Sequence, residues 1–170
     1  RITDFDQDGN LRNDTLLSLD PKVAQSYLLN EGDVLFARSG ATVGKTFIYR
    51  ESNGDACFAG YLIKAATIKQ ILSSDFLYFL TQSNYYENWK ESVFSQATIQ
   101  NIGADKYQDF LVPVPSIEEQ REIVLFIVSK SENIKSSIIK IQREIDLISE
   151  YKTSLINEAV TGKIKVSDAI

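Results

Sequence analysis

The stretch that decides the fold is SIEEQREIVLFIVSKSENIKSSIIKIQREIDLISEYKTSLINEAVTG, residues 116–162. It opens with Ser116 and Glu119 at the spacing of a helix-capping box, and it closes at Gly162, a residue type that commonly ends helices. No glycine or proline interrupts residues 117–161. The pattern therefore predicts one uninterrupted helix, which at 1.5 Å per residue would be about 65–70 Å long.

The apolar residues of this stretch follow the seven-residue period of helices that pack lengthwise on other helices. We expect a helix interface made of Ile127, Ile134, Ile138, Ile141, Ile145, Ile148 and Leu155. A second apolar set, including Ile139 and Leu147, lies largely off this seam, which favours a bundle of several helices. Too little chain remains to bury such a helix, so pairing with another subunit is favoured over a bundle within this chain.

Ahead of the long helix, short strand and helix signals alternate. Stretches next to turn residues, one of them alternating aromatic and β-branched residues, predict four strands. These fall at residues 1–10, 33–40, 45–50 and 56–65. Apolar spacings of three and four predict a helix over residues 75–93 with Asp75 as its N-cap. Residues 106–115 should be extended, because a residue that precedes proline avoids helical angles.

The predicted fold is therefore α+β, with a mixed globular domain followed by a long coiled-coil-type helix. The expected parts are a globular domain at residues 1–115, the helix at 116–162 and a tail at 163–170. The chain has 170 residues, 44% of them hydrophobic, which is enough for a core. No apolar run reaches the roughly 18 residues of a membrane span. We expect a cytoplasmic protein without a membrane partner, and the single Cys57 fits a reducing compartment.

Composition removes several classes of enzyme. The chain has no histidine and one cysteine, which excludes histidine general bases, Cys–His nucleophile pairs and the usual zinc sites. No pair of the 23 acidic residues stands out, so a carboxylate-dependent hydrolase is only a minor alternative. We expect no catalytic residue, metal or cofactor. The net charge of −5 argues against DNA binding by bulk attraction, although a local basic patch or a basic partner can override it.

The segment ARSGATVGKT, residues 37–46, looks at first like a phosphate-binding loop. The motif needs a glycine where Ser39 stands, and its lysine-containing end must open a helix. Here the following FIYRES alternates as a strand does. An NTPase is therefore rejected, and the segment is interpreted as a glycine-rich, cationic turn between two strands.

Three stretches, in order, resemble the specificity (S) subunit of type I restriction-modification systems. They are EGDVLFARSGATVGKTFIY (31–49), FSQATIQNIGADKYQDFLVPVPSIEEQREIV (94–124) and EYKTSLINEAVTGKI (150–164). The second resembles the family's Thr-Gln-x-x-Ile/Leu segment and its Pro-x-Pro-x-x-Glu-Gln helix start. The matching positions are Thr98, Gln100, Ile102, Pro113, Pro115, Glu119 and Gln120, with Ile99 as a departure in spacing.

The resemblance implies a non-catalytic subunit whose target recognition domain reads a DNA half-site. The long helix would space two such domains and gather methyltransferase (M) subunits, and a motor endonuclease (R) subunit can join. A full S subunit has two recognition domains and two helices, so this chain resembles half of one. It starts at Arg1 and has no methionine, and we expect its recognition domain to lack an N-terminal part. Two copies, or this chain with a second S half, would pair antiparallel and read an interrupted palindrome.

The resemblance also implies which residues contact double-stranded DNA. The turn would offer Arg38, Ser39, Thr42, Lys45 and Thr46, and the amide-rich segment would offer Gln96, Thr98, Gln100, Asn101 and Lys106. Alternatively, Arg38 pairs with a nearby carboxylate and the amide-rich segment caps the next element. A third region could be formed by Tyr85, Tyr86, Trp89 and Lys90, although aromatic residues at helical spacing are more often core. Lys22 and Lys64 are weaker candidates.

One alternative function belongs to a different class. The chain could be a coiled-coil assembly adaptor whose globular domain binds protein and never contacts DNA. The two functions differ in whether DNA is present in the assembled complex.

The acidic charge generates a first prediction. The isolated chain should bind a labelled DNA duplex weakly, and binding should become strong when M subunits are added, because they would supply most of the attraction for phosphates. Fluorescence anisotropy with and without M subunits measures this. Tight, sequence-specific binding by the chain alone would contradict the prediction.

Overall fold

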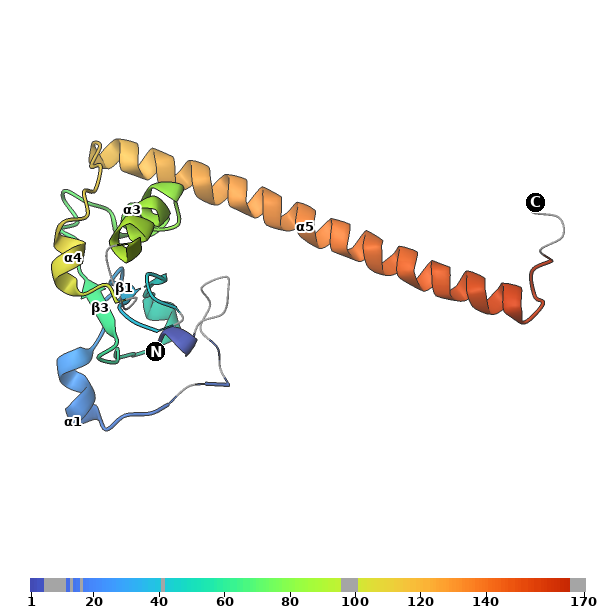
Figure 1. Ribbon diagram of the computed structural model, residues 1–170, viewed down its shortest axis with the longest axis horizontal. Helices are drawn as coiled ribbons and strands as arrows, with labels where there is room; N and C mark the ends of the chain where they lie inside the picture. The colour runs from blue at the N-terminus through green and yellow to red at the C-terminus, as the bar shows by residue number, and fades with distance from the viewer. Residues whose placement is uncertain (5–11, 13, 16, 41, 96–100, 166–170) are drawn as a thin grey trace. The chain divides into compact units, whose positions relative to one another are not determined.

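The computed structural model of the protein describes residues 1–4, 12, 14–15, 17–40, 42–95 and 101–165 (Figure 1). The chain divides into two compact units, Arg1–Val124, here called the head, and Leu125–Ile170. Among the described residues, no helix is long and apolar enough to cross a membrane.

A three-stranded antiparallel sheet is the centre of the described part of the head. Its order is β2-β1-β3, with β1 at Val34–Ala37, β2 at Thr46–Ile48 and β3 at Leu62–Ala65. Val34 lies opposite Ile48 on one side and Ala65 on the other. Every residue of β1 is buried, because the strand has a neighbour at each edge and side chains over both faces.

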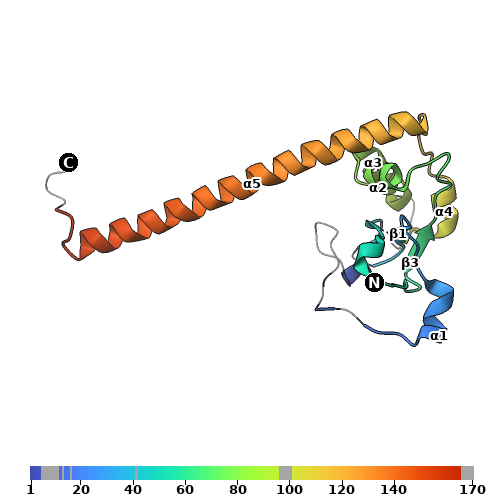
Figure 2. The same cartoon turned by 180° about the vertical axis from the view of Figure 1, so that it is seen from behind.

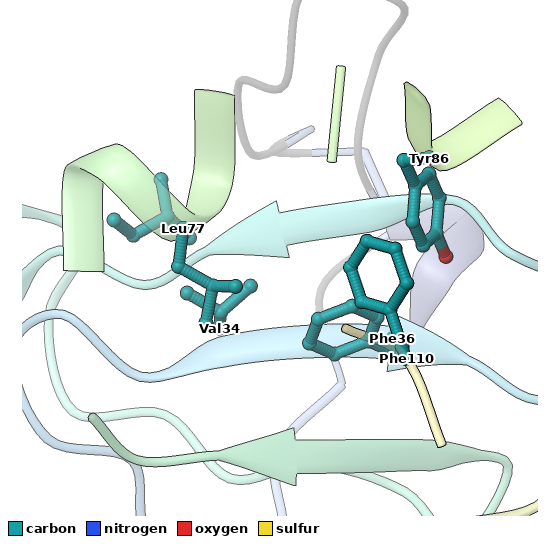
Figure 3. Close-up of a cluster of buried hydrophobic side chains, with 6 residues drawn as sticks. Val34, Phe36, Leu77, Tyr86 and Phe110 are labelled. Carbon is teal, nitrogen blue, oxygen red and sulfur yellow. The ribbon is translucent and has the colours of Figure 1, made fainter. Parts of the chain in front are cut away.

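The two faces of β1 belong to two apolar clusters, as the two-residue period of a strand requires. Val34 and Phe36 pack with Ile48, Leu77, Tyr86 and Phe110, and most of this cluster is drawn in Figure 3. Leu35 and Ala37 pack with Phe47, Tyr49 and Leu62 in the other cluster. The sheet is therefore a packed layer with a core on both sides.

Short helices surround this sheet. They are α1 (Pro21–Ala24), α2 (Ser74–Leu80), α3 (Asn84–Ser95) and α4 (Ala104–Gln108), with 3-10 turns η1 (Ile2–Asp4), η2 (Gln25–Tyr27) and η3 (Glu51–Asn53). Helix α2 packs on β1 and β2, and Figures 1 and 2 both show α3 near the sheet and α4 beside β3. The helical side chains Leu77 and Tyr86 complete the cluster that contains Val34 and Phe36.

The strands predicted at residues 33–40 and 45–50 are confirmed over Val34–Ala37 and Thr46–Ile48, as β1 and β2. The strand predicted at 56–65 is confirmed only in its second half, as β3. The strand predicted at 1–10 is wrong at Ile2–Asp4, which form η1, because the Asp4 carboxylate accepts hydrogen bonds from the ammonium and guanidinium of Arg1. Residues 5–10 lie outside the described residues.

The single helix predicted over residues 75–93 is wrong, because two helices, α2 and α3, occupy this stretch. Between them, the hydroxyls of Thr81 and Ser83 donate to the carbonyls of Tyr78 and Leu80 at 2.6 Å each. Such local bonds compete with the helical ladder. The capping role predicted for Asp75 is also wrong, since α2 starts after Ser73 and Asp75 forms an ion pair with Arg50.

The extended segment predicted at residues 106–115 is wrong over 106–108, which belong to α4. The backbone N–H groups of Lys106 and Tyr107 donate to the carbonyl of Gly103, which closes this short helix. Residues 109–115 form no regular helix or strand beyond a turn at Asp109, as the two prolines favour.

The long helix is confirmed as α5, Ile117–Val160, with 44 residues. The Ser116 hydroxyl accepts a hydrogen bond from the Glu119 N–H at 3.2 Å. At the other end Gly162 has a φ of 74°, and the Lys163 N–H donates to the Glu158 carbonyl at 2.8 Å. This closing pattern is the Schellman motif, in which glycine adopts the left-handed conformation that other residues avoid.

Most of the predicted seam of α5 is exposed within the second unit. Ile134, Ile138, Ile141, Ile145 and Ile148 are each 54–67% exposed. Figure 1 shows this helix as a single continuous element. A row of large aliphatic side chains exposed to water is unusual for a protein surface.

The first turns of α5 belong to the head, where Gln120 is completely buried. Its Oε1 accepts a hydrogen bond from the Ser73 N–H at 2.8 Å. Its Nε2 donates to the carbonyls of Ile71 and Pro115 at 2.9 Å each. Both amide N–H groups are therefore used, and the start of α5 is fixed to the loop that precedes α2.

This contact predicts a large effect on stability. Gln120→Leu should lower the free energy of unfolding by about 2–4 kcal/mol, because one N–H and two carbonyls would lose their buried partner. The matched control is Gln142→Leu, which removes an exposed amide of the same helix bonded to Asp146, and it should change stability by less than about 0.5 kcal/mol. Urea unfolding measures both variants, and equal losses would contradict the role of Gln120.

Candidate nucleic-acid interface

The turn between β1 and β2, of which residues 38–40 and 42–45 are described, contains two glycines with positive φ. Gly40 and Gly44 have φ values of 84° and 78°, a region that side chains with a Cβ rarely adopt. The Gly44 N–H donates to the Ala37 carbonyl at 2.8 Å, and the Ala37 N–H donates to the Lys45 carbonyl at 2.9 Å. The strand ladder therefore continues up to the base of the turn and fixes where the turn begins.

The turn lies directly beside Asn101, far away in the sequence. Ser39 and Asn101 form an isolated antiparallel bridge, and the Ile102 N–H donates to the Arg38 carbonyl at 2.8 Å. Ile102 is completely buried, which anchors this contact from below. The two segments that the sequence offered as separate DNA-binding candidates are thus adjacent at Arg38, Ser39 and Asn101.

Four of the candidate residues present exposed polar side chains, namely Arg38, Lys45, Asn101 and Lys106. Within the described part of the chain, the side chains of Arg38, Lys45 and Lys106 form no ion pair with a carboxylate, so the pairing considered for Arg38 is not observed there. Ser39 and Thr42 are half-buried. Gln96, Thr98 and Gln100 lie outside the described residues. The described candidates therefore supply both cationic and amide groups.

Thr46 is engaged inside the protein. Its hydroxyl lies 2.6 Å from that of Thr81 and accepts a hydrogen bond from Gln82 Nε2 at 2.8 Å. These contacts tie the start of β2 to the end of α2. The structure thus gives Thr46 an anchoring role in addition to any that it has at the surface.

Behind the turn, Tyr86 is completely buried and supports Gly44. Its hydroxyl donates to the Gly44 carbonyl at 2.8 Å and lies 3.2 Å from the hydroxyl of Tyr107. Burial raises the pKa of the Tyr86 hydroxyl and raises the pKa of Tyr107 to about 12. Both groups are therefore neutral near pH 7 and keep the protons that these bonds require.

The aromatic region of α3 is core, which was the favoured of the two alternatives. Tyr86 stacks on Trp89 with ring centroids 5.7 Å apart and meets Phe36 edge-on. Lys90 pairs with Glu87 at 2.5 Å, and its side chain is only 15% exposed because it packs over Gly44. Tyr85 is half-exposed, and its hydroxyl donates to the Leu111 carbonyl at 2.8 Å. Tyr86 and Lys90 contact Gly44 and thus form the floor of the turn.

The remaining basic candidates differ in their surroundings. Lys64 lies 3.4 Å from the buried carboxylate of Asp33, so part of its charge is neutralised. Lys22 is exposed on α1. Tyr107 and Thr81 were not predicted from the sequence, because each acquires its role only through a partner that the fold brings close to it.

An apolar groove of about 360 Å³ lies beside β3, elsewhere on the head. Ile63 and Ala65 of β3 form one wall, and Ile71, Val112 and Val114 contribute to the others. Such a lining suits an apolar side chain and offers little to a phosphate.

Comparison with known proteins decides the family. The family model described as the type I restriction modification DNA specificity domain matches residues 9–147. The chain belongs to this family. The resemblance seen in the sequence is confirmed, and the predicted α+β fold is confirmed with it.

Individual relatives of this specificity domain are distant. The specificity subunit of the type I restriction enzyme StySPI from Salmonella potsdam is 22% identical over 145 residues, which are 84% of this chain and 31% of that relative. A solved structure described as the basis of complex assembly and conformational transition of the type I R-M system matches with a TM-score of 0.69 and 17% identity. That match covers 95% of this chain and 41% of the solved chain, and it shows a shared fold. The specificity domain thus spans less than half of each relative.

The two glycines of the turn generate a paired prediction. Gly40→Ala should cost about 1 kcal/mol through its positive φ alone, because nothing lies within 4 Å of an added Cβ. Gly44→Ala should cost about 1 kcal/mol more, because the added methyl displaces Lys90 from its packed position. Urea unfolding measures both. In a Lys90→Ala background the two costs should become equal, and a persisting difference would show that Lys90 is not its cause.

Proposed function

We propose that this chain is a non-catalytic specificity subunit of a type I restriction-modification complex that reads one DNA half-site. The observation that carries the proposal is the contact surface, defined as residues 38–40, 42–46 and 101–106. On it, exposed cationic and amide side chains come from two distant segments that meet at the bridge between Ser39 and Asn101. Membership of the DNA specificity family supports DNA as the ligand.

The side chains of this surface suit a DNA groove. The guanidinium of Arg38 can donate two hydrogen bonds to the edge of a guanine, and the amide of Asn101 can pair in the same way with adenine. Lys45 and Lys106 suit phosphates, as do the hydroxyls of Ser39 and Thr42. Gln96, Thr98 and Gln100 adjoin Asn101 in the sequence and stay candidates for base contacts. The expected recognition domain remains residues 1–115.

The exposed seam of α5 is the proposed interface that brings two DNA-reading heads into one complex. It would pair with the same helix of a second copy, or with the second half of an S subunit, in antiparallel orientation. Two identical heads would then meet an interrupted palindrome. Apolar side chains off the seam would bind M subunits, and an R subunit can join that complex.

One observation favours the alternative, an assembly adaptor with a protein-binding head. The groove beside β3 is apolar and could receive the side chain of a protein partner. An adaptor needs no DNA in any complex that it forms. A specificity subunit is therefore expected to direct methylation to a DNA word, and an adaptor is not.

The test of the proposed function is a map of methylation. The chain would be expressed with type I M subunits in a host without its own adenine methylation, and methylated adenines would be located across the genome. The expected result is one interrupted word. A stable complex with M subunits that methylates nothing would favour the adaptor.

The contact surface predicts graded effects of charge removal. Arg38→Ala should weaken binding of the methylated word by about 1–3 kcal/mol and relax discrimination at one base. Lys45→Ala should weaken binding of all sequences alike and lower the salt slope by about 1. The control is Lys69→Ala. Lys69 is exposed and lies near Glu31, a residue that precedes β1, whereas the turn follows β1. Titration of the complex with M subunits measures all three. Equal losses for Lys69→Ala and Arg38→Ala would contradict this surface.

The seam predicts the state of association. Ile141→Lys should convert the self-associated chain to a monomer, because a charge would be buried at the pairing face. Ile139→Lys is the control, since Ile139 is equally apolar, is 69% exposed and lies off the seam. Light scattering gives the mass of each variant. A wild-type chain that is already monomeric would contradict pairing with a second copy.

A further inference from the structure

We propose that the hydroxyls of Tyr86 and Tyr107 form a positioning pair that holds the two halves of the contact surface in register. The pair would determine how well the surface distinguishes one base from another, with little effect on how strongly it attracts DNA in general. This inference rests on the proposed function, because it assigns a role within that same surface.

The first step is the position of the pair between the two segments. At the outer end, Ser39 and Asn101 are joined by their bridge. At the inner end, the Gly44 carbonyl is joined through Tyr86 to Tyr107, which follows Lys106 on α4. The two segments are thus tied at both ends, and α3 supplies the inner tie.

The second step is the direction of the bonds. Tyr86 has one hydroxyl proton, and this proton is donated to Gly44. The contact between the two hydroxyls at 3.2 Å must therefore use the Tyr107 proton, with Tyr86 accepting. The result is a directed chain from Tyr107 to Tyr86 to the Gly44 carbonyl. Bonds in such a chain polarise and strengthen one another.

The third step is that Gly44 depends on this hydroxyl. Among the described residues, the Tyr86 hydroxyl is the one hydrogen-bond donor recorded for the Gly44 carbonyl. Tyr86 is completely buried, so water does not replace the lost donor readily. Tyr86→Phe keeps the ring, its stacking on Trp89 and its edge-on contact with Phe36, while releasing the backbone at Gly44.

The fourth step connects position with discrimination. Long cationic side chains such as Lys45 reach a phosphate even when the backbone beneath them shifts. A two-bond contact with a base edge has strict geometry and fails when its supporting backbone moves by about 1 Å. A loosened turn should therefore bind unrelated DNA normally and distinguish the correct word less well.

The chain offers a close control for this hydroxyl. Tyr85 is the neighbour of Tyr86 on α3, and its hydroxyl also donates to a backbone carbonyl at 2.8 Å. That carbonyl belongs to Leu111, outside the contact surface. Tyr85→Phe thus removes the same kind of bond from the same helix without touching the turn.

The experiment uses the full chain assembled with M subunits. Three duplexes would be titrated, one with the methylated word, one with a single base changed in each half-site, and one unrelated. Tyr86→Phe should lower the ratio of affinities between the first two duplexes about tenfold, the scale of one bidentate base contact. Tyr107→Phe should have a smaller effect, and the double variant should be no worse than Tyr86→Phe, because Tyr107 acts through Tyr86. Tyr85→Phe should leave the ratio unchanged.

A second measurement does not depend on DNA. Amide hydrogen exchange should become faster within residues 38–46 and 101–107 in Tyr86→Phe, and should stay at the wild-type rate there in Tyr85→Phe. An equal loss of affinity for all three duplexes, or no change in exchange, would overturn the positioning role. A wild-type complex that methylates no word would instead contradict the proposed function, and hydrogen exchange alone would then decide the positioning role.

Discussion

The buried amide of Gln120 is the contact on which the organisation of the head and its helix depends. An amide that uses both of its N–H groups and its oxygen has one orientation, and its partners at Ile71, Ser73 and Pro115 are all backbone groups. An aliphatic side chain of similar size would fill the same space but would fix no orientation. The rotation of the first turn of α5 about the helix axis is therefore set within the head, where the helix begins.

The long helix and the strands β1 and β2 were predictable because their signals are local. The seven-residue period of α5 repeats along one stretch, and the apolar run Val34–Ala37 stands directly after turn residues. The break at Thr81–Ser83 was not predictable in this way, since apolar spacing continues across it while two hydroxyls take the backbone carbonyls. Residue type alone does not determine whether a backbone carbonyl here bonds to a helical N–H or to a side-chain hydroxyl. The choice also depends on Thr46, which contacts Thr81 across the fold.

The candidate site also combines features that residue types predict with features that only the fold creates. Residue types indicated a cationic turn and an amide-rich segment, but the bridge between Ser39 and Asn101 exists only in the fold. Lys45 was a predicted DNA contact, and Lys90 belonged to a weaker candidate region for which a core role was favoured. In the structure, one is exposed, whereas the other pairs with Glu87 and covers Gly44. The residue types therefore indicate the chemistry of a surface, but packing determines which of those residues are exposed to a ligand.

The turn between β1 and β2 has a first limb around Gly40 and a second limb around Gly44, and the two differ in how closely they are packed. This difference affects how such a surface can change over evolution. Around Gly40 an added side chain would meet open space, whereas Gly44 is enclosed by Lys90 and bonded to Tyr86. Substitutions in the first limb can alter the chemical groups offered to a ligand, while the contacts of the second limb maintain the backbone conformation of the turn. A library randomised at Arg38 and Ser39, with Gly40 kept for its positive φ, would therefore sample new preferences at little cost in foldability, which makes these two positions the natural starting point for diversification.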